Sequence, residues 1–363
     1  MSRILRYDRH LLTVVALLLV LGLTMIYSSS AAVALNKKGS PAYFASHQAL
    51  WAVVGVVAFA VAMRIPYERW KDRRVVLALM GLELGLLCLA LAGPTINGSH
   101  RWIKLGRMTL QPSESAKFVV ILFAAYLLDK RLRENREWVQ TLLPLGAFAG
   151  IVSALIVIQP DLGTVVVIAV ALGTMLFLAG LPWKWIVPAA ATGLAALAVL
   201  IVSTPYRFQR LLTFMNPGAD PKDAGFQAQQ SLIAVGSGGI FGKWFGSGSQ
   251  KLMFLPEPHT DFIYAMIGEE LGFVGALLIL GLFVYLGYRG LRAARSAPDA
   301  FGTYLATGIT AWVLLQALIH VGVTLTLLPT KGLPLPLISY GGSNLVVTLA
   351  GLGVLVNISQ HQE

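Results

Sequence analysis

Asp261 is the side chain whose setting best suits acid–base chemistry. A proline-rich stretch, residues 256–260, leads into it, and a long apolar segment follows it. An aspartate at this position can act as a general base, or it can stabilise a helix N-terminus through the helix dipole. Glu269 follows about 12 Å further along a helix at 1.5 Å per residue, so the two carboxylates cannot form the close pair of a retaining glycosidase.

Glu114 and Lys117 form a second group that allows two interpretations. Pro112 and Ser113 introduce an apolar segment, and the spacing of three residues places both charged side chains on one helix face. The pair can lock the helix end among its neighbours. Alternatively, Lys117 faces an anionic ligand and Glu114 orients it.

Basic side chains gather in two further places, and most of them are arginines. The planar guanidinium group binds phosphate through two parallel hydrogen bonds. Binding of anionic lipid headgroups is the alternative interpretation. The residues concerned are Arg101, Lys104, Arg107, Arg207 and Arg210.

These groups belong to a chain that is too apolar for a soluble protein. Of its 363 residues, 56% are hydrophobic and 12% are charged, and the mean hydropathy is +0.71, whereas roughly a quarter of a soluble domain is charged. The single cysteine, Cys88, excludes a disulfide within one chain and a thiolate metal cluster, and the six histidines show no zinc-type spacing. The net charge of +11 does not indicate nucleic-acid binding, because the distribution of these charges matters more than their sum.

Ten apolar segments are long enough to cross a bilayer, which takes about 20 residues. They predict an all-α integral membrane protein with about ten transmembrane helices in a single polytopic domain, residues 1–363. The stretch 204–261 is too long for an unstructured loop, and we expect it to be an ordered, functional extracytoplasmic loop between helices 7 and 8. The predicted helices cover residues 11–34, 47–63, 75–93, 113–129, 141–158, 162–180, 186–203, 262–288, 302–327 and 338–357.

The basic residues between these segments predict the orientation of the chain. With the N-terminus in the cytoplasm, about 16 Lys and Arg residues fall in inner segments and about six in short outer loops. This difference predicts that both termini are cytoplasmic. The long stretch 204–261 also carries basic residues, but long loops cross the membrane largely regardless of their charge.

Read together, the motifs resemble the SEDS family (shape, elongation, division, sporulation) of integral-membrane peptidoglycan glycosyltransferases. The resemblance extends over nearly the whole chain, with the motifs in family order, and it is closer to the division-type members than to the elongation-type members. The matching motifs lie at 97–103, 111–117, 159–164, 230–239, 254–262, 269–272 and 334–343, and the division-type features lie at 210–214, 225–227, 97–99 and 328–332.

The resemblance implies polymerisation of lipid II on the outer face of the cytoplasmic (inner) membrane. The family's essential aspartate falls on Asp261. The implied partners are a class B penicillin-binding protein, which is a transpeptidase that activates the polymerase, together with other division or elongation proteins and membrane lipids. The candidate substrate-binding residues are Arg101, Glu114, Lys117, Arg207, Arg210, Glu257, His259, Lys331, Ser339 and Ser343.

The expected chemistry is an inverting transfer, in which a base takes the acceptor hydroxyl proton and positive charge stabilises the departing pyrophosphate. Asp261 supplies the base and Lys117, Arg101 and Arg210 the charge. A divalent cation, Mg²⁺ or Mn²⁺, is a candidate cofactor, although no ligand set in the sequence demands one. A lipid II flippase and a non-catalytic division scaffold are the alternatives from other classes.

Three positions depart from the family pattern. Residues 243–245 (Lys-Trp-Phe) are bulky where family loops tend to be glycine-rich, His320 stands where asparagine is usual, and Asn344 replaces a frequent serine. None of them is Asp261, so the expected activity is unchanged. His320 can alter helix packing or add a titratable group near the cavity.

Overall fold

The computed structural model describes residues 7–95, 99–106, 108–216, 224–248 and 257–360. Arg107 and parts of the motifs at 97–103 and 254–262 therefore lie outside the described residues. The elements are α1 (Arg9–Lys38), α2 (Tyr43–Arg64), the 3₁₀ helix η1 (Tyr67–Lys71), α3 (Arg73–Leu91), β1 (Ile103–Leu105), β2 (Met108–Leu110), α4 (Pro112–Glu134), α5 (Trp138–Ile158), α6 (Leu162–Leu178), α7 (Trp183–Val202), α8 (Pro205–Met215), α9 (Ala224–Ser237), α10 (Ile263–Ser296), α11 (Ala300–Thr324) and α12 (Gly342–Ser359).

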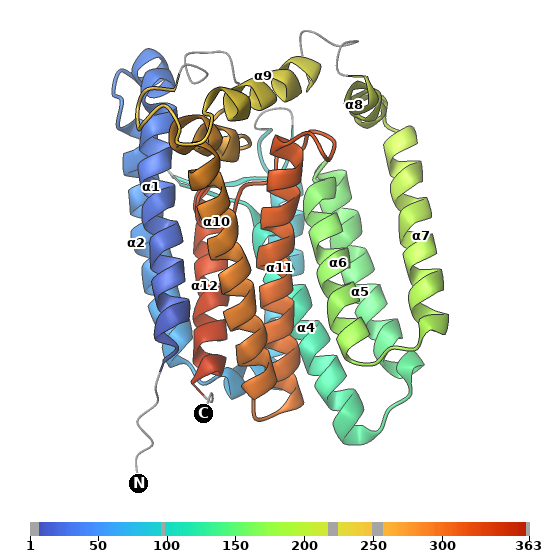
Figure 1. The fold of residues 1–363 in the computed structure, drawn as a ribbon. Helices are drawn as coiled ribbons and strands as arrows, with labels where there is room; N and C mark the ends of the chain where they lie inside the picture. Colours follow the sequence, from blue (N-terminus) through green and yellow to red (C-terminus); the bar gives the residue numbers. More distant parts are fainter. Residues whose placement is uncertain (1–6, 96–98, 107, 217–223, 249–256, 361–363) are drawn as a thin grey trace.

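Each predicted membrane segment is a helix in the structure, namely α1 to α7 and α10 to α12. These helices run side by side along one direction (Figure 1). Eight of them are long and apolar enough to cross a membrane. Of the other two, α6 has only 17 residues, and α4 carries the buried pair Glu114 and Lys117. The chain is a multi-pass, all-α membrane protein.

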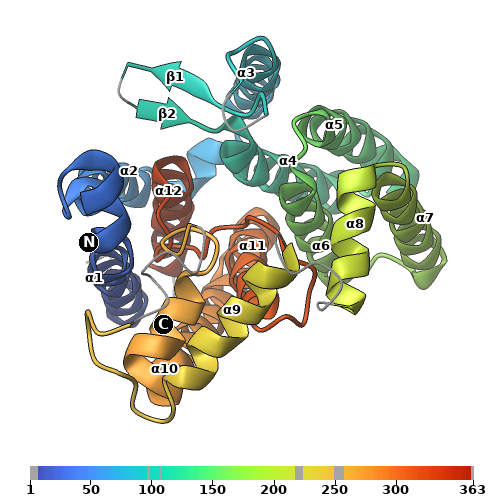
Figure 2. The same ribbon diagram turned by 90° about the horizontal axis from the view of Figure 1, so that it is seen from above.

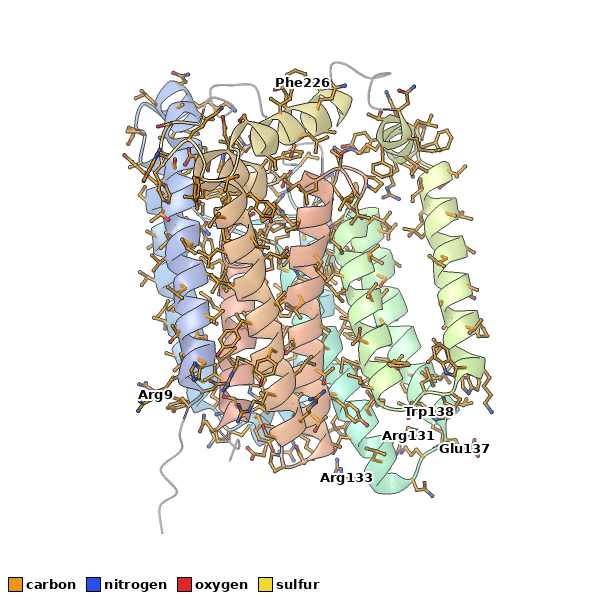
Figure 3. The ribbon with its side chains drawn as sticks, in the orientation of Figure 1. Arg9, Arg131, Arg133, Glu137, Trp138 and Phe226 are labelled. Atoms are coloured by element: carbon orange, nitrogen blue, oxygen red, sulfur yellow. The ribbon has the colours of Figure 1, made fainter. Side chains whose placement is uncertain are left out.

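The two ends of the bundle differ in their chemistry. The first residues of α1 and the last of α12 lie at the lower end in Figure 1, whereas α8 and α9 lie across the upper end. Arg9, Arg131 and Arg133 lie at the lower end, opposite Phe226 of α9 (Figure 3). The long stretch predicted to be ordered therefore contains two helices, at the end of the bundle opposite these basic residues.

Polar groups concentrate on the helices at the centre of the bundle. Seen from above, α4, α11 and α12 lie inside, and α7 lies at the edge (Figure 2). α7 buries none of its residues. A helix that is apolar all round is stable in lipid without a protein neighbour, whereas the buried side chains of α4 and α11 need polar partners from the same chain.

α10 is broken at Gly272, which the sequence pattern did not reveal. This glycine has φ 68° and ψ −169°, a conformation open to glycine and strained for other residues. The loop after α9 fills the break. The backbone N–H of Lys243 donates to Glu269 O at 3.0 Å, and Phe273 N–H donates to Gly239 O at 2.9 Å. The backbone groups that the break leaves without helical partners are thus satisfied, as burial at membrane depth requires.

Candidate active site

Asp261 lies in the turn before α10 and is partly buried. Among the described residues, no side chain or backbone N–H donates a hydrogen bond to its carboxylate. α10 begins after Phe262 without a side-chain cap, so Asp261 makes no capping hydrogen bond to this helix. Its carboxylate is therefore available to accept a proton.

The turn that carries Asp261 is fixed by the loop between α11 and α12. The Ser339 hydroxyl donates to the backbone oxygen of Thr260 at 2.7 Å, and the Tyr340 N–H donates to the backbone oxygen of His259 at 2.9 Å. The Ser339 hydroxyl in turn accepts the N–H of Leu335 at 2.8 Å. Ser339 is a candidate substrate-binding residue. In the structure its hydroxyl holds the turn that carries Asp261 in place.

His259 and Glu257 lie on the same turn. The buried His259 ring stacks on Phe44 of α2, with 4.4 Å between the ring centroids, and its Nε2 lies 3.6 Å from Glu257 Oε2. Burial, aided by the positive charge of Lys37, lowers the pKa of His259 to about 4. His259 is therefore neutral near pH 7, and its contact with Glu257 is not an ion pair.

Two arginines from distant parts of the chain face Asp261. Arg210 of α8 donates from Nη1 to Thr330 O at 2.9 Å, and Arg101, just before β1, donates to the backbone oxygens of residues 159 and 160. Burial and, to a smaller extent, the charge of Glu257 raise the pKa of Asp261 to about 6, against the opposing charges of Arg210 and Arg101. A pKa near 6 suits a general base that works near neutral pH.

Lys331 completes a group of cations beside this carboxylate. Burial, together with the charges of Arg207, Arg210 and Arg101 and against the opposing charge of Asp161, lowers the pKa of Lys331 to about 8. Positive charges that act on one another in this way favour binding of an anion such as a phosphate group. We call Arg101, Arg207, Arg210 and Lys331 the cation cluster.

Glu114 and Lys117 lie elsewhere, in a fully buried network between α4, α11 and α12. Lys117 Nζ lies 2.8 Å from Glu114 Oε2 and donates to Gln316 Oε1 at 2.6 Å. Asn344 Nδ2 donates to Glu114 Oε2 at 2.6 Å. The structure therefore does not bring Lys117 into the cation cluster, and every contact recorded for the pair fits the locking role.

This network also holds the loop that carries Lys331. Gln316 Nε2 donates to Pro334 O at 2.8 Å, and the His320 ring nitrogen Nδ1 lies 2.7 Å from Leu333 O. Two residues that depart from the family pattern thus have hydrogen-bond partners in this network: His320 contacts Leu333, and Asn344 contacts Glu114. Gln316 was missed by the sequence reasoning, although an amide in an apolar segment could have indicated it.

Ser343 joins α12 to the hairpin and to α4. Its hydroxyl donates to Thr109 O at 3.1 Å and accepts the N–H of Gln111 at 3.0 Å.

A metal site built only from protein side chains is not seen among the described residues. They contain no group of three His, Cys, Asp or Glu side chains that could hold a metal ion. A Mg²⁺ or Mn²⁺ ion bound by one or two carboxylates together with phosphate oxygens needs no such group, so a divalent cation stays a candidate cofactor, and no step below depends on it.

Gly332 gives a prediction about the space beside the reactive carboxylate. A Cβ atom at Gly332 would lie 2.9 Å from Asp261 Oδ2, so we expect Gly332→Ala to displace the carboxylate. Because Gly332 is exposed, folding should change little, whereas the rate of the reaction should fall roughly 10- to 100-fold. The matched control is Gly236→Ala, where an added Cβ meets nothing within 4 Å. Equal activity of the two variants would show that the position of Asp261 is not critical.

Comparison with known proteins identifies the family. Residues 8–363 match the model of the FtsW/RodA/SpoVE family, described as a cell cycle protein. The chain belongs to this family. Among its FtsW/RodA/SpoVE relatives, the probable peptidoglycan glycosyltransferase FtsW of Geobacter metallireducens is 40% identical over 99% of this chain and 96% of its own length. Stage V sporulation protein E of Bacillus subtilis is 40% identical over 98% of this chain and 97% of its own length.

Solved structures show that the fold is shared within the family. The RodA of Thermus thermophilus, a rod shape determining protein, aligns with a TM-score of 0.74 at 28% identity, over 99% of both chains. A structure described as the structural coordination of polymerization and crosslinking by a peptidoglycan synthase complex aligns with a TM-score of 0.77 at 30% identity, over 98% of this chain and 99% of that chain. The arrangement of helices is therefore that of the SEDS fold predicted from the motifs.

Proposed function

We propose that this protein is a peptidoglycan glycosyltransferase that polymerises lipid II into glycan strands during cell division. The observation that carries the proposal is the Asp261 carboxylate, which has no hydrogen-bond partner among the described residues and lies beside the cation cluster. The relatives named probable peptidoglycan glycosyltransferase FtsW support both the activity and the division role.

In the proposed reaction, Asp261 and the cation cluster have separate roles. Asp261 accepts the proton of the acceptor sugar hydroxyl as that oxygen forms a bond to the anomeric carbon of the donor sugar. The bond between that carbon and the pyrophosphate oxygen breaks, and the electron pair leaves with the pyrophosphate. The cation cluster stabilises the negative charge that develops on the leaving group, as positioned charges do in other transfers from phosphate.

We further propose a transpeptidase partner and a location in the inner membrane. A structure of a synthase complex that coordinates polymerisation and crosslinking aligns with this chain, which supports a class B penicillin-binding protein as the transpeptidase partner. The excess of basic residues at the end of the bundle where α1 begins supports cytoplasmic termini in the inner membrane. Asp261 and α8 then lie on the outer side, where lipid II is polymerised.

The orientation can be tested with single cysteines in a Cys88→Ala background. Gln209 on α8 is exposed at the upper end, so Gln209→Cys should react with an impermeant thiol reagent in intact cells. Ser296 ends α10 at the lower end, and Ser296→Cys should react only after the cells are opened. The reverse pattern would place Asp261 in the cytoplasm and exclude polymerisation on the outer face.

The pH dependence of polymerisation should be bell-shaped. Asp261 must be deprotonated to act as a base, and its pKa of about 6 means that activity rises as the pH increases through 6. Lys331 must be protonated to stabilise pyrophosphate, and its pKa of about 8 means that activity falls as the pH increases through 8. Initial rates of purified protein with lipid II between pH 5 and 9 would measure both limbs.

A lysine-to-arginine variant separates the two limbs. Arginine stays charged throughout this range, so Lys331→Arg should keep the acidic limb and lose the alkaline limb. A rate that does not change between pH 5 and 7 would contradict a general base with the pKa of Asp261.

A further inference from the structure

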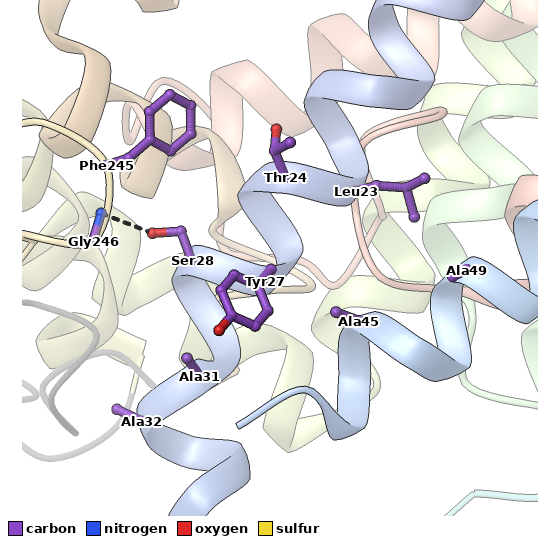
Figure 4. Close-up of a pocket in the computed structure, with 10 residues that line it drawn as sticks. All are labelled: Leu23, Thr24, Tyr27, Ser28, Ala31, Ala32, Ala45, Ala49, Phe245 and Gly246. Atoms are coloured by element: carbon purple, nitrogen blue, oxygen red, sulfur yellow. Dashed lines mark hydrogen bonds between the residues drawn. The ribbon is translucent and has the colours of Figure 1, made fainter. Parts of the chain in front are cut away.

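An apolar groove of about 750 Å³ opens between α1, α2 and the loop after α9. Figure 4 shows that the loop approaches α1 there, with the backbone N–H of Gly246 donating to the Ser28 hydroxyl at 3.1 Å. Tyr27 and Phe245 line the groove, and each is 51% exposed. This loop contains the bulky segment 243–245, which departs from the family pattern. The other lining side chains include Leu23, Ala31, Ala45 and Ala49.

The length of the groove matches one leaflet of a membrane. On α1 it runs from Leu23 to Ala32, about 14 Å at 1.5 Å per residue. Half of a hydrocarbon core is about 15 Å thick, whereas a transmembrane helix of a partner would need a surface about 30 Å long. The α1 residues that line the groove extend from the middle of this helix into its second half, which lies towards the end of the bundle that carries α8 and α9 (Figure 1). Its size and place therefore fit a hydrocarbon chain in the outer leaflet.

Positive charge lies at the outer end of this groove. Ala31, Leu35 and Lys38 follow one another on one face of α1 at helical spacing, so the apolar stripe ends at an ammonium group. Lys37 is next to it, and both lysines are exposed. A chain in the groove would therefore place an attached anionic group against two lysines.

The groove is also close to the proposed base. Ala45 lines the groove, and the next side chain along α2, Phe44, stacks on His259. His259 is two residues before Asp261, and the charge of Lys37 acts on its ring. The turn that carries His259 and Asp261 is therefore reached by positive charge from both directions, with Lys37 acting on His259 and Arg210 and Arg101 acting on Asp261.

We propose that the groove holds the polyprenyl chain of the acceptor lipid, with its pyrophosphate at Lys37 and Lys38 and its sugar hydroxyl at Asp261. This inference rests on the proposed function, because polymerisation of lipid II joins two molecules that each carry a polyprenyl pyrophosphate. The donor needs the cation cluster, since its pyrophosphate leaves. The acceptor keeps its pyrophosphate and needs only to be held, which two exposed lysines and an apolar groove can do.

Photocrosslinking in the Asp261→Asn variant tests this assignment without turnover. The protein in lipid nanodiscs is irradiated with a polyprenyl pyrophosphate that carries a diazirine on its chain, and the labelled peptides are identified by mass spectrometry. We expect labels on α1 and α2. Ala49→Trp, which fills the groove, should lower this labelling roughly tenfold. The neighbouring Leu50→Trp is the matched control, because Leu50 is 51% exposed and does not line the groove.

A second variant tests the headgroup without changing the packing. Lys37→Gln/Lys38→Gln should lower labelling by the pyrophosphate probe roughly tenfold at low salt. It should leave labelling by the uncharged polyprenyl alcohol unchanged, and this pair of probes keeps the test decisive if Ala49→Trp does not fold.

Several outcomes would overturn the proposal. Equal labelling of Ala49→Trp and Leu50→Trp would place the chain elsewhere, and loss of labelling in excess phosphatidylglycerol would assign the groove to bulk phospholipid. Labelling that disappears only when a transpeptidase is added would assign the groove to a partner helix. Failure of the proposed function itself is distinguishable, because the wild-type protein would then make no glycan chains from lipid II, whether or not the groove is labelled.

Discussion

Asp261→Asn should reduce glycan synthesis from lipid II by 10²- to 10⁴-fold, the usual cost of losing a general base. Asparagine keeps the size of the side chain but cannot accept the acceptor proton. Because no described residue donates a hydrogen bond to the Asp261 carboxylate, the substitution breaks no contact that the structure records. Gel analysis of glycan chains made by purified wild-type and variant protein would measure the effect.

The stability of this variant distinguishes a base from a helix-end charge. A charge at a helix N-terminus contributes about 0.3–1 kcal/mol to stability and need not affect the rate. If Asp261 is the base, thermal unfolding in detergent and binding of the transpeptidase should stay close to wild type while polymerisation nearly disappears. A variant that unfolds more easily but polymerises at more than about a tenth of the wild-type rate would remove Asp261 as the base.

Lys117→Ala should be the most destabilising single change at the centre of the bundle. It leaves the buried Glu114 carboxylate without its cation, and breaking a buried ion pair costs about 3–5 kcal/mol. It also removes one of the two side chains that donate to Gln316 Oε1, and Gln316 holds Pro334 in the loop that carries Lys331. We therefore expect a lower unfolding temperature together with lower polymerisation.

The double variant Glu114→Gln/Lys117→Met separates stability from chemistry. Removing both charges avoids an uncompensated buried carboxylate, so much of the lost stability should return. If Lys117 acts only by locking the helices, polymerisation should recover in parallel with the unfolding temperature. Recovery of folding with no recovery of activity would restore the interpretation in which Lys117 faces an anionic ligand.

The sequence alone predicted those features that depend on local pattern. Apolar runs of about 20 residues predict membrane helices because each backbone group must be satisfied within its own segment, and all ten predicted segments are helical. Asp261 could be singled out because an ionisable group next to a membrane segment is energetically costly, and such groups often have a function. The family and its helical fold were predicted from motifs spread over the whole chain, and both are confirmed.

Features that depend on contacts between distant residues could not be predicted. Glu114 and Lys117 are three residues apart, but whether they face a ligand or a helix depends on side chains far along the chain. Gln316 is 199 residues from Lys117, and Asn344 is 230 residues from Glu114. The break at Gly272 likewise depends on backbone partners from the loop after α9. Periodicity describes which face of a helix is apolar, and it does not identify what packs against that face.

The most direct test of the central claim is to place purified wild-type protein with its transpeptidase in vesicles that contain lipid II, and to measure glycan chains and lipid II crossing in the same sample. We expect long glycan chains from the wild type and almost none from Asp261→Asn. Lipid II that crosses the bilayer at equal rates in both proteins, with no chains made by either, would contradict the account and identify the protein as a transporter.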